Sequence, residues 1–198
     1  SNIKNPLDKS LVSIFNNYLE KITESLNKYQ FAEALNLTED FFWNYFTDNY
    51  IELVKNRRLN GSSVDSLSAS TTLILILENV LKLFAPFVPM ITDEIWLTMY
   101  PDKKSIHLQK WPQKIDVDLN NISSHEFEVA KESIASIRKE KTSNEIGLGK
   151  EVEKITITVN KEKIEALNQV LGDVQDAARA NNLAINSSEE NNEIKSEI

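Results

Sequence analysis

The chain has 198 residues, of which 41% are hydrophobic, enough for one helical domain and a small additional unit. It contains no cysteine, which excludes disulfides and thiolate metal sites, and its two histidines, His107 and His125, have no obvious ligand partners in the sequence. The net charge of −8 argues against unspecific affinity for nucleic acids. We see no signal peptide and no apolar run of roughly 18–20 residues, so we expect a cytoplasmic protein without a membrane partner.

The first half of the chain predicts helices. Apolar residues recur every three or four positions over residues 8–28 and again over 31–57, which indicates two amphipathic helices. Asp65 or Ser66 can cap a third helix that ends at residue 84. Its centre, Leu-Ile-Leu-Ile-Leu, is apolar on all sides, so we expect it to be the most buried element. With a fourth helix, described next, the short connections favour an antiparallel helical bundle.

Two prolines, Pro86 and Pro89, form a corner after the third helix. Each lacks a backbone N–H, and its ring clashes with the carbonyl four residues earlier, so the helix ends here. Proline is tolerated in the first turn of a helix, so a fourth helix can begin at the corner and run to about residue 100. We expect the corner to be scaffold, with Trp96 packed in the core.

The pattern changes after residue 100. Apolar and polar residues alternate over residues 155–159, which predicts a strand. The expected elements are an extended segment over 105–112, helices over 127–141 and 161–180, and strands over 152–159 and 183–185. The fold class is therefore mainly α: a bundle over residues 1–120 and a small α+β unit over 121–186. Residues 187–198 are expected to form an acidic tail without fixed structure.

The sequence shows no catalytic constellation. None of its four glycines belongs to a phosphate-binding loop pattern. Residues 139–143, Lys-Glu-Lys-Thr-Ser, have some similarity to a KMSKS loop, but they end a predicted helix instead of following a nucleotide-binding fold. Asp93 and Glu94 are adjacent on a helix, so their side chains diverge, and they are better explained as complementing the helix dipole than as an acid–base pair.

Aromatic and basic residues are the candidates for binding. Residues 41–50 contain more rings than one helical stripe can bury. In an α-helix Trp43 and Tyr50, seven apart, share a face that continues to Arg57, and Lys55 and Arg58 lie close by. Rings and cations at a helix end can stack unpaired bases and hold phosphates. The simpler alternative is a wide buried face, with the cations complementing the C-terminal dipole.

A second basic group lies in the later helix. Arg138 and Lys141 are three residues apart, so they share a helix face, and Lys150 follows in the next loop. These cations could hold the stem of a nucleic-acid hairpin. A solvated helix end is the alternative explanation for the same residues.

Four segments together resemble class I aminoacyl-tRNA synthetases for branched aliphatic amino acids. Residues 43–55, Trp-Asn-Tyr-Phe-Thr-Asp-Asn-Tyr-Ile-Glu-Leu-Val-Lys, resemble their F-C-D-x-Y-L-E-L-x-K helix. Residues 83–96 resemble L-x-P-x-x-P-F-x-x-E-E-I-W, residues 105–112 resemble S-I-x-L-x-x-W-P, and residues 137–141 resemble I-R-x-x-[KR]. The order and spacing are those of the family, over residues 7–160. Valyl enzymes of archaeal type are most similar, and isoleucyl enzymes remain an alternative.

The resemblance implies the anticodon-binding helical domain and the start of the C-terminal extension. Its expected partners are a tRNA, specific for valine, and the catalytic domain of the same polypeptide. ATP and Mg would belong to that catalytic domain, since this chain has neither a HIGH nor a KMSKS motif and needs no cofactor of its own. The implied contacts to tRNA are Trp43, Tyr50, Lys55, Arg57, Arg58, Arg138 and Lys141.

The sequence departs from the family pattern in places, and these departures weaken the case for base stacking. Thr47 stands where cysteine is common, and Asn49 stands where tryptophan is frequent. A structural or protein-interaction bundle without RNA binding is therefore the second hypothesis, and the acidic pI of about 4.9 favours it.

Overall fold

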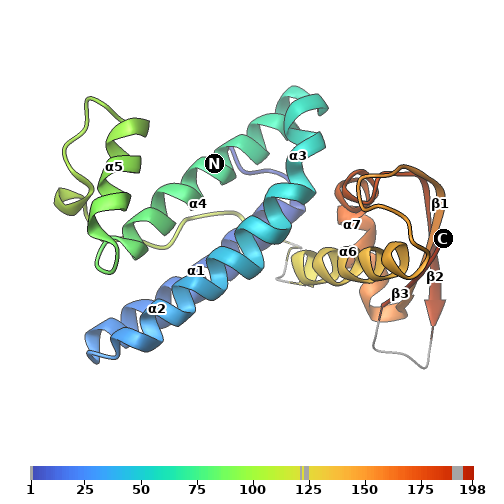
Figure 1. The fold of residues 1–198 in the computed structure, drawn as a ribbon, viewed down its shortest axis with the longest axis horizontal. Helices are drawn as coiled ribbons and strands as arrows, with labels where there is room; N and C mark the ends of the chain where they lie inside the picture. The colour runs from blue at the N-terminus through green and yellow to red at the C-terminus, as the bar shows by residue number, and fades with distance from the viewer. Residues whose placement is uncertain (1, 121, 123–124, 189–193) are drawn as a thin grey trace.

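The computed structural model describes residues 2–120, 122, 125–188 and 194–198. Long helices form one half of the molecule, and two helices with a small sheet form the other (Figure 1). The elements in chain order are α1 (Pro6–Asn27), α2 (Phe31–Asp40), the π-helix η1 (Phe41–Tyr50), α3 (Ile51–Asn60), α4 (Ser63–Phe84), α5 (Pro89–Met99), the 3-10 helix η2 (Ile106–Leu108), α6 (His125–Ser143), β1 (Val152–Asn160), α7 (Lys161–Ala178), β2 (Ala180–Ser188) and β3 (Lys195–Glu197).

Short polar residues fix where the helices begin. The Asn5 side chain accepts a hydrogen bond from the backbone N–H of Leu7, and Pro6 occupies the first helical position of α1. The Ser62 hydroxyl accepts from the backbone N–H of Asp65, so α4 begins at Ser63, earlier than the sequence pattern predicts. Pro89 opens α5, which confirms the expected corner.

Helices α2, η1 and α3 form one continuous helix with a π-helical middle. There the backbone N–H of Ile51 donates to the carbonyl of Phe46, five residues earlier. A turn of this kind holds more residues than an α-helical turn. Phe41, Phe46 and Tyr50 are spaced by five and four positions, and all three are buried. The wider turn therefore explains how so many rings of one segment face the same core.

Helix α5 lies across the end of α4 instead of completing a four-helix bundle (Figure 1). It packs on α4 and η2, and buried Trp96 joins Leu81, Ala85 and Ile106 in a small cluster separate from the main core. The indole N–H of Trp96 donates to the carbonyl of Lys104. Trp96 is therefore buried, as expected, but in this small cluster with α4 and η2 and outside the main core to which α1 and η1 contribute.

The centre of α4 is not the most buried segment, contrary to the sequence expectation. Ile74 is 52% exposed because one side of α4 faces outward, whereas α1 buries Leu7, Leu11 and Phe15 completely. By length and composition α4 could cross a membrane. A single helix of this kind is weak evidence for a membrane span, because core helices of soluble proteins pass the same test. Helix α4 packs against α1, α2 and α3.

The C-terminal unit contains a three-stranded sheet in the order β2-β1-β3. Strands β1 and β2 are parallel, with α7 as the crossover helix between them, and β3 runs antiparallel to β1. Ser187 and Ser188 complete β2, and Lys195–Glu197 forms β3. The unstructured tail expected over residues 187–198 is therefore wrong for these residues, while residues 189–193 lie outside the described part.

One core extends through both halves of the molecule. Helix α1 contacts α6 and α7, and α3 contacts α7. Buried side chains of the helical half and of the sheet belong to a single cluster, which includes Phe15, Leu53, Phe127 and Ile155. The junction between the halves is therefore a packed interface, and it positions the candidate binding residues.

Candidate nucleic-acid interface

Arg57 lies inside the junction, where it bridges two carboxylates. Its Nη2 is 2.6 Å from Asp8 Oδ1 on α1, and its Nε is 2.7 Å from Asp173 Oδ1 on α7. Asp8 also accepts hydrogen bonds from the Tyr50 hydroxyl at 2.8 Å and from the Ser68 hydroxyl at 2.6 Å. We call Asp8, Arg57 and Asp173 the Arg57 clasp, since it joins α1, α3 and α7.

Burial governs the protonation of this network. Burial raises the pKa of Asp173 to about 6, although the Arg57 guanidinium acts in the opposite direction. Burial opposes the charge of Arg57, but the carboxylates of Asp8 and Asp173 outweigh it and hold the pKa of Arg57 above its ordinary value. Burial and then the charge of Asp8 raise the pKa of Tyr50 well above its ordinary value, so its hydroxyl stays a donor.

The predicted RNA contacts of Tyr50 and Arg57 are therefore wrong. Tyr50 is fully buried, and Arg57 directs its donors to the Asp8 and Asp173 carboxylates and to the backbone carbonyl of Asp65. The seven-residue spacing of Trp43 and Tyr50 places them on one face only in an α-helix. In the π-helix the two side chains separate: Tyr50 points into the core, and Trp43 is 54% exposed.

Lys141 is also buried, contrary to its predicted role. Its ammonium donates to the carbonyls of Lys150 at 2.7 Å, Ala178 at 2.8 Å and Leu148 at 3.4 Å. Burial, followed by the nearby charge of Arg179, lowers the pKa of Lys141. Lys141 therefore ties α6 to the following loop and to the end of α7, and it has no direct access to a ligand.

The other predicted residues remain available at the surface. Trp43, Lys55 and Arg58 are exposed, and Arg138 is partly exposed. Lys55 Nζ lies 3.8 Å from the Glu52 carboxylate, and both terminal nitrogens of Arg138 reach the Asp48 carbonyl only at 3.5 Å. These side chains are held weakly, so they could turn to a ligand.

A groove of about 360 Å³ brings α3, α6 and α7 together. Glu52 of α3, Arg138 of α6 and Arg179 at the end of α7 line it, above the buried Lys141. We call it the Arg138–Arg179 groove. It brings Glu52, on the helix that carries Lys55, to Arg138 of α6, but neither Lys55 nor Trp43 is among its lining residues.

Arg179 is a basic residue that the sequence analysis missed. It caps α7 in the left-handed conformation, with φ of 53°, and its Nη1 donates to the Gly149 carbonyl at 3.0 Å. This conformation costs a non-glycine residue roughly 1–2 kcal/mol. Tyr29 and Glu145, at the ends of α1 and α6, share the conformation. The sequence carries no signal for Arg179 beyond a lone cation after an amphipathic helix.

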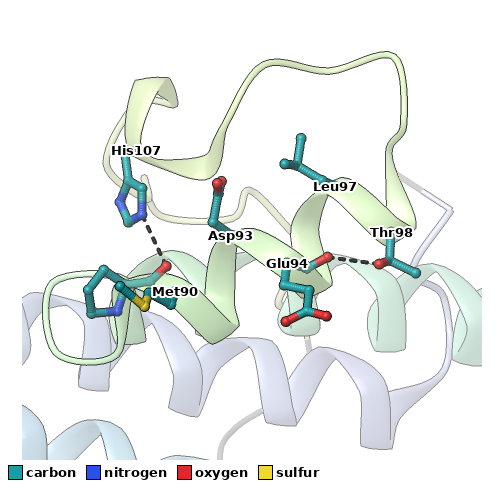
Figure 2. A pocket seen from close by; sticks show the side chains of 7 residues that line it. Met90, Asp93, Glu94, Leu97, Thr98 and His107 are labelled. Carbon is teal, nitrogen blue, oxygen red and sulfur yellow. Dashed lines mark hydrogen bonds between the residues drawn. The ribbon is translucent and has the colours of Figure 1, made fainter.

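A separate hollow of about 730 Å³ lies on the outer side of α5 (Figure 2). Met90 and Leu97 supply apolar surface, and Met90 is 88% exposed. His107 Nε2 lies 3.1 Å from the Pro89 carbonyl, while the Asp93 carboxylate accepts from the backbone N–H of Ile106. The polar groups here hold η2 on α5. The hollow is far from the Arg138–Arg179 groove, at the opposite end of the molecule (Figure 1).

Sequence comparison settles which family these residues come from. The family described as the anticodon-binding domain of tRNA ligase matches residues 8–157. The chain belongs to this family. The resemblance predicted from the four segments is therefore confirmed. Of the groove residues, Glu52 and Arg138 fall inside the matched region of the anticodon-binding domain, and Arg179 falls outside it.

Relatives of the anticodon-binding domain are valine–tRNA ligases. The chain is 34% identical over 175 residues to that of Wolbachia pipientis wMel, which covers 88% of the chain and 20% of the relative. It is 33% identical over 170 residues to that of the archaeon Methanothermobacter thermautotrophicus, covering 85% and 19%, and 37% identical over 159 residues to that of Ehrlichia canis, covering 78% and 20%. The chain spans about one fifth of the length of these curated relatives.

Proposed function

We propose that this anticodon-binding domain recognises the anticodon stem-loop of a tRNA specific for valine. The observation that carries the proposal is the position of its exposed cations. Arg138 lines the groove at the junction of the two halves, and Lys55 lies 3.8 Å from Glu52, another residue that lines it, although the chain as a whole is acidic. The valine–tRNA ligase relatives, archaeal ones included, favour valine over isoleucine as the specificity.

The exposed residues divide into two roles. Lys55, Arg58 and Arg138 contact phosphates, which gives affinity without reading sequence. Trp43 stacks on an unpaired base, since its indole is 54% exposed and is braced by Phe42, whose ring centroid lies 4.7 Å away. Tyr50, Arg57 and Lys141 act indirectly, because they hold the helices that present these groups.

The wider enzyme is part of the same proposal. By similarity to its relatives, the chain is one segment of a cytoplasmic ligase that joins valine to its tRNA at the expense of ATP. ATP and Mg would bind the catalytic domain of that polypeptide, which is the second partner. The segment itself contributes binding and orientation, and the chemistry takes place elsewhere.

The test is binding of the isolated chain to a valine tRNA and an isoleucine tRNA transcript at 50 and 200 mM salt. We expect tighter binding of the valine tRNA and a steep loss of affinity with salt. Trp43→Ala should weaken binding roughly tenfold, from about 1–3 kcal/mol of stacking. Phe31→Ala is the control, since Phe31 is about as exposed as Trp43 but lies at the first residue of α2, away from the π-helix that carries Trp43. Equal, negligible retention of both tRNAs at 50 mM salt would favour the purely structural bundle.

A further inference from the structure

We propose that the Arg138–Arg179 groove holds a backbone phosphate of the bound RNA, with Arg179 as a contact from outside the matched family region. The inference rests on the function proposed above. The inference adds to that function a place, the mouth of the groove between α6 and the end of α7, and a residue, Arg179.

The first support is uncompensated charge. Arg138, Lys141 and Arg179 come together at this groove, and within the part of the chain that the structure describes none of them forms an ion pair with a carboxylate. Glu52 is the carboxylate of the groove, and it lies 3.8 Å from Lys55. Three cationic side chains and one carboxylate line the groove, which gives it a net positive charge, so the groove attracts an anion.

The second support is unused hydrogen-bonding capacity. A guanidinium has five N–H donors in a planar fork that matches a phosphate. Arg138 spends its terminal nitrogens on one carbonyl at 3.5 Å, the long limit of a hydrogen bond. Arg179 makes one bond at 3.0 Å to Gly149 and is otherwise exposed. Both arginines can therefore offer a bidentate face to a phosphate without breaking a strong contact.

The buried Lys141 defines the floor of this site. Its three carbonyl partners engage all its donors, so it cannot reach the ligand directly. It holds the 148–150 loop and the end of α7 together, and Arg179 donates to that same loop. A phosphate at the mouth would meet two arginines on a rigid support. Among the described residues that line the groove none is aromatic, so they offer nothing on which a base could stack.

Fluorescence anisotropy with labelled valine and isoleucine tRNA transcripts tests the site at 50, 100 and 200 mM salt. The variants are Arg138→Gln and Arg179→Gly. Glycine suits the left-handed backbone of residue 179, so that variant should keep its fold, which circular dichroism checks. Lys104→Gln is the matched control. It removes the same charge from an exposed side chain whose backbone carbonyl accepts from Trp96 of α5. Helix α5 lies at the opposite end of the molecule from α6 and α7 (Figure 1).

Each groove variant should make the negative slope of log affinity against log salt less steep by about 0.7–0.9, which is roughly a sixfold loss of affinity at 0.1 M salt. The loss should be equal for valine and isoleucine tRNA, since a phosphate carries no sequence. If wild type binds and both variants behave as Lys104→Gln does, the groove is not a phosphate site, and the proposed function stands without it. A loss confined to valine tRNA would show base reading and overturn the assignment. If wild type binds neither tRNA, the proposed function and the groove fail together.

Discussion

Replacing Arg57 with methionine would remove the cation of the Arg57 clasp while filling most of its volume. The side chains of Asp8 and Asp173 are 0% and 4% exposed, so both carboxylates would be left buried without a counter-ion. Removing one partner of a buried ion pair costs about 3–5 kcal/mol. Because Arg57 serves two carboxylates, we expect Arg57→Met to fall in the upper half of that range.

Thermal unfolding followed by circular dichroism at pH 7 measures this cost. For a chain of this size 1 kcal/mol corresponds to about 2–4 °C, so the midpoint should fall by roughly 8–20 °C. The control is Arg58→Met, because Arg58 is adjacent but exposed, and its loss should change stability by less than about 0.5 kcal/mol. Equal, small shifts in both variants would place the Arg57 guanidinium in water. That result would refute the clasp and restore Arg57 as a candidate phosphate contact.

Two further predictions concern buried groups at the same junction. Asp173 holds its proton more tightly in the folded state, with a pKa of about 6 against an ordinary 3.8, so its stabilising contribution is complete below about pH 4 and is lost as the pH rises through 6. In urea unfolding, the free energy of unfolding should therefore fall less between pH 4 and pH 7 for Asp173→Asn than for wild type, with a difference of up to about 3 kcal/mol. Parallel curves of this free energy against pH would contradict the raised pKa. Lys141→Met leaves three carbonyls without their donor and should lower the free energy of unfolding by about 1–3 kcal/mol, whereas the exposed Lys139→Met should leave it unchanged. Equal urea midpoints for the two lysine variants would show that the ammonium of Lys141 is not buried.

The helices and their ends could largely be predicted from the sequence, because the signals are local. Apolar spacing marks α1, and Pro86 and Pro89 mark the boundary between α4 and α5. The sequence places the start of α4 three or four residues late, since Ser62 caps it in preference to Asp65 or Ser66. Several short polar residues competed for one cap, and spacing alone does not choose among them.

The burial of individual side chains could not be predicted in the same way. The π-helix changes the phase of residues 41–50, and the expected α-helical face of Trp43 and Tyr50 does not exist there. Arg57 has carboxylate partners 49 and 116 residues away in the sequence. A basic residue at a helix end looks the same whether such partners exist or not, so only the tertiary structure separates Arg57 from Arg58.

The site was predicted in part for the same reason. Lys55, Arg58 and Arg138 lie at the surface, as a contact to RNA requires, whereas Lys141 faces inward although it is only three residues from Arg138. Side chains three positions apart on an α-helix point in similar but not identical directions, and the edge of the buried stripe passes between these two positions. Arg179 reaches the groove through the crossover of α7, which no local pattern indicates.

The crossover between β1 and β2 also sets how this domain can be moved between proteins. The matched family region stops at residue 157, inside β1. A fragment cut there would lose α7 and β2, leave Ile155 and Ile157 without their neighbouring strand, and deprive Arg57 of Asp173. The unit that folds is therefore larger than the unit that is matched. A chimaera that exchanges this domain between ligases would need to carry the chain through β2. A graft that ends at the family boundary would transfer helices α1 to α6 without the structure that packs against them.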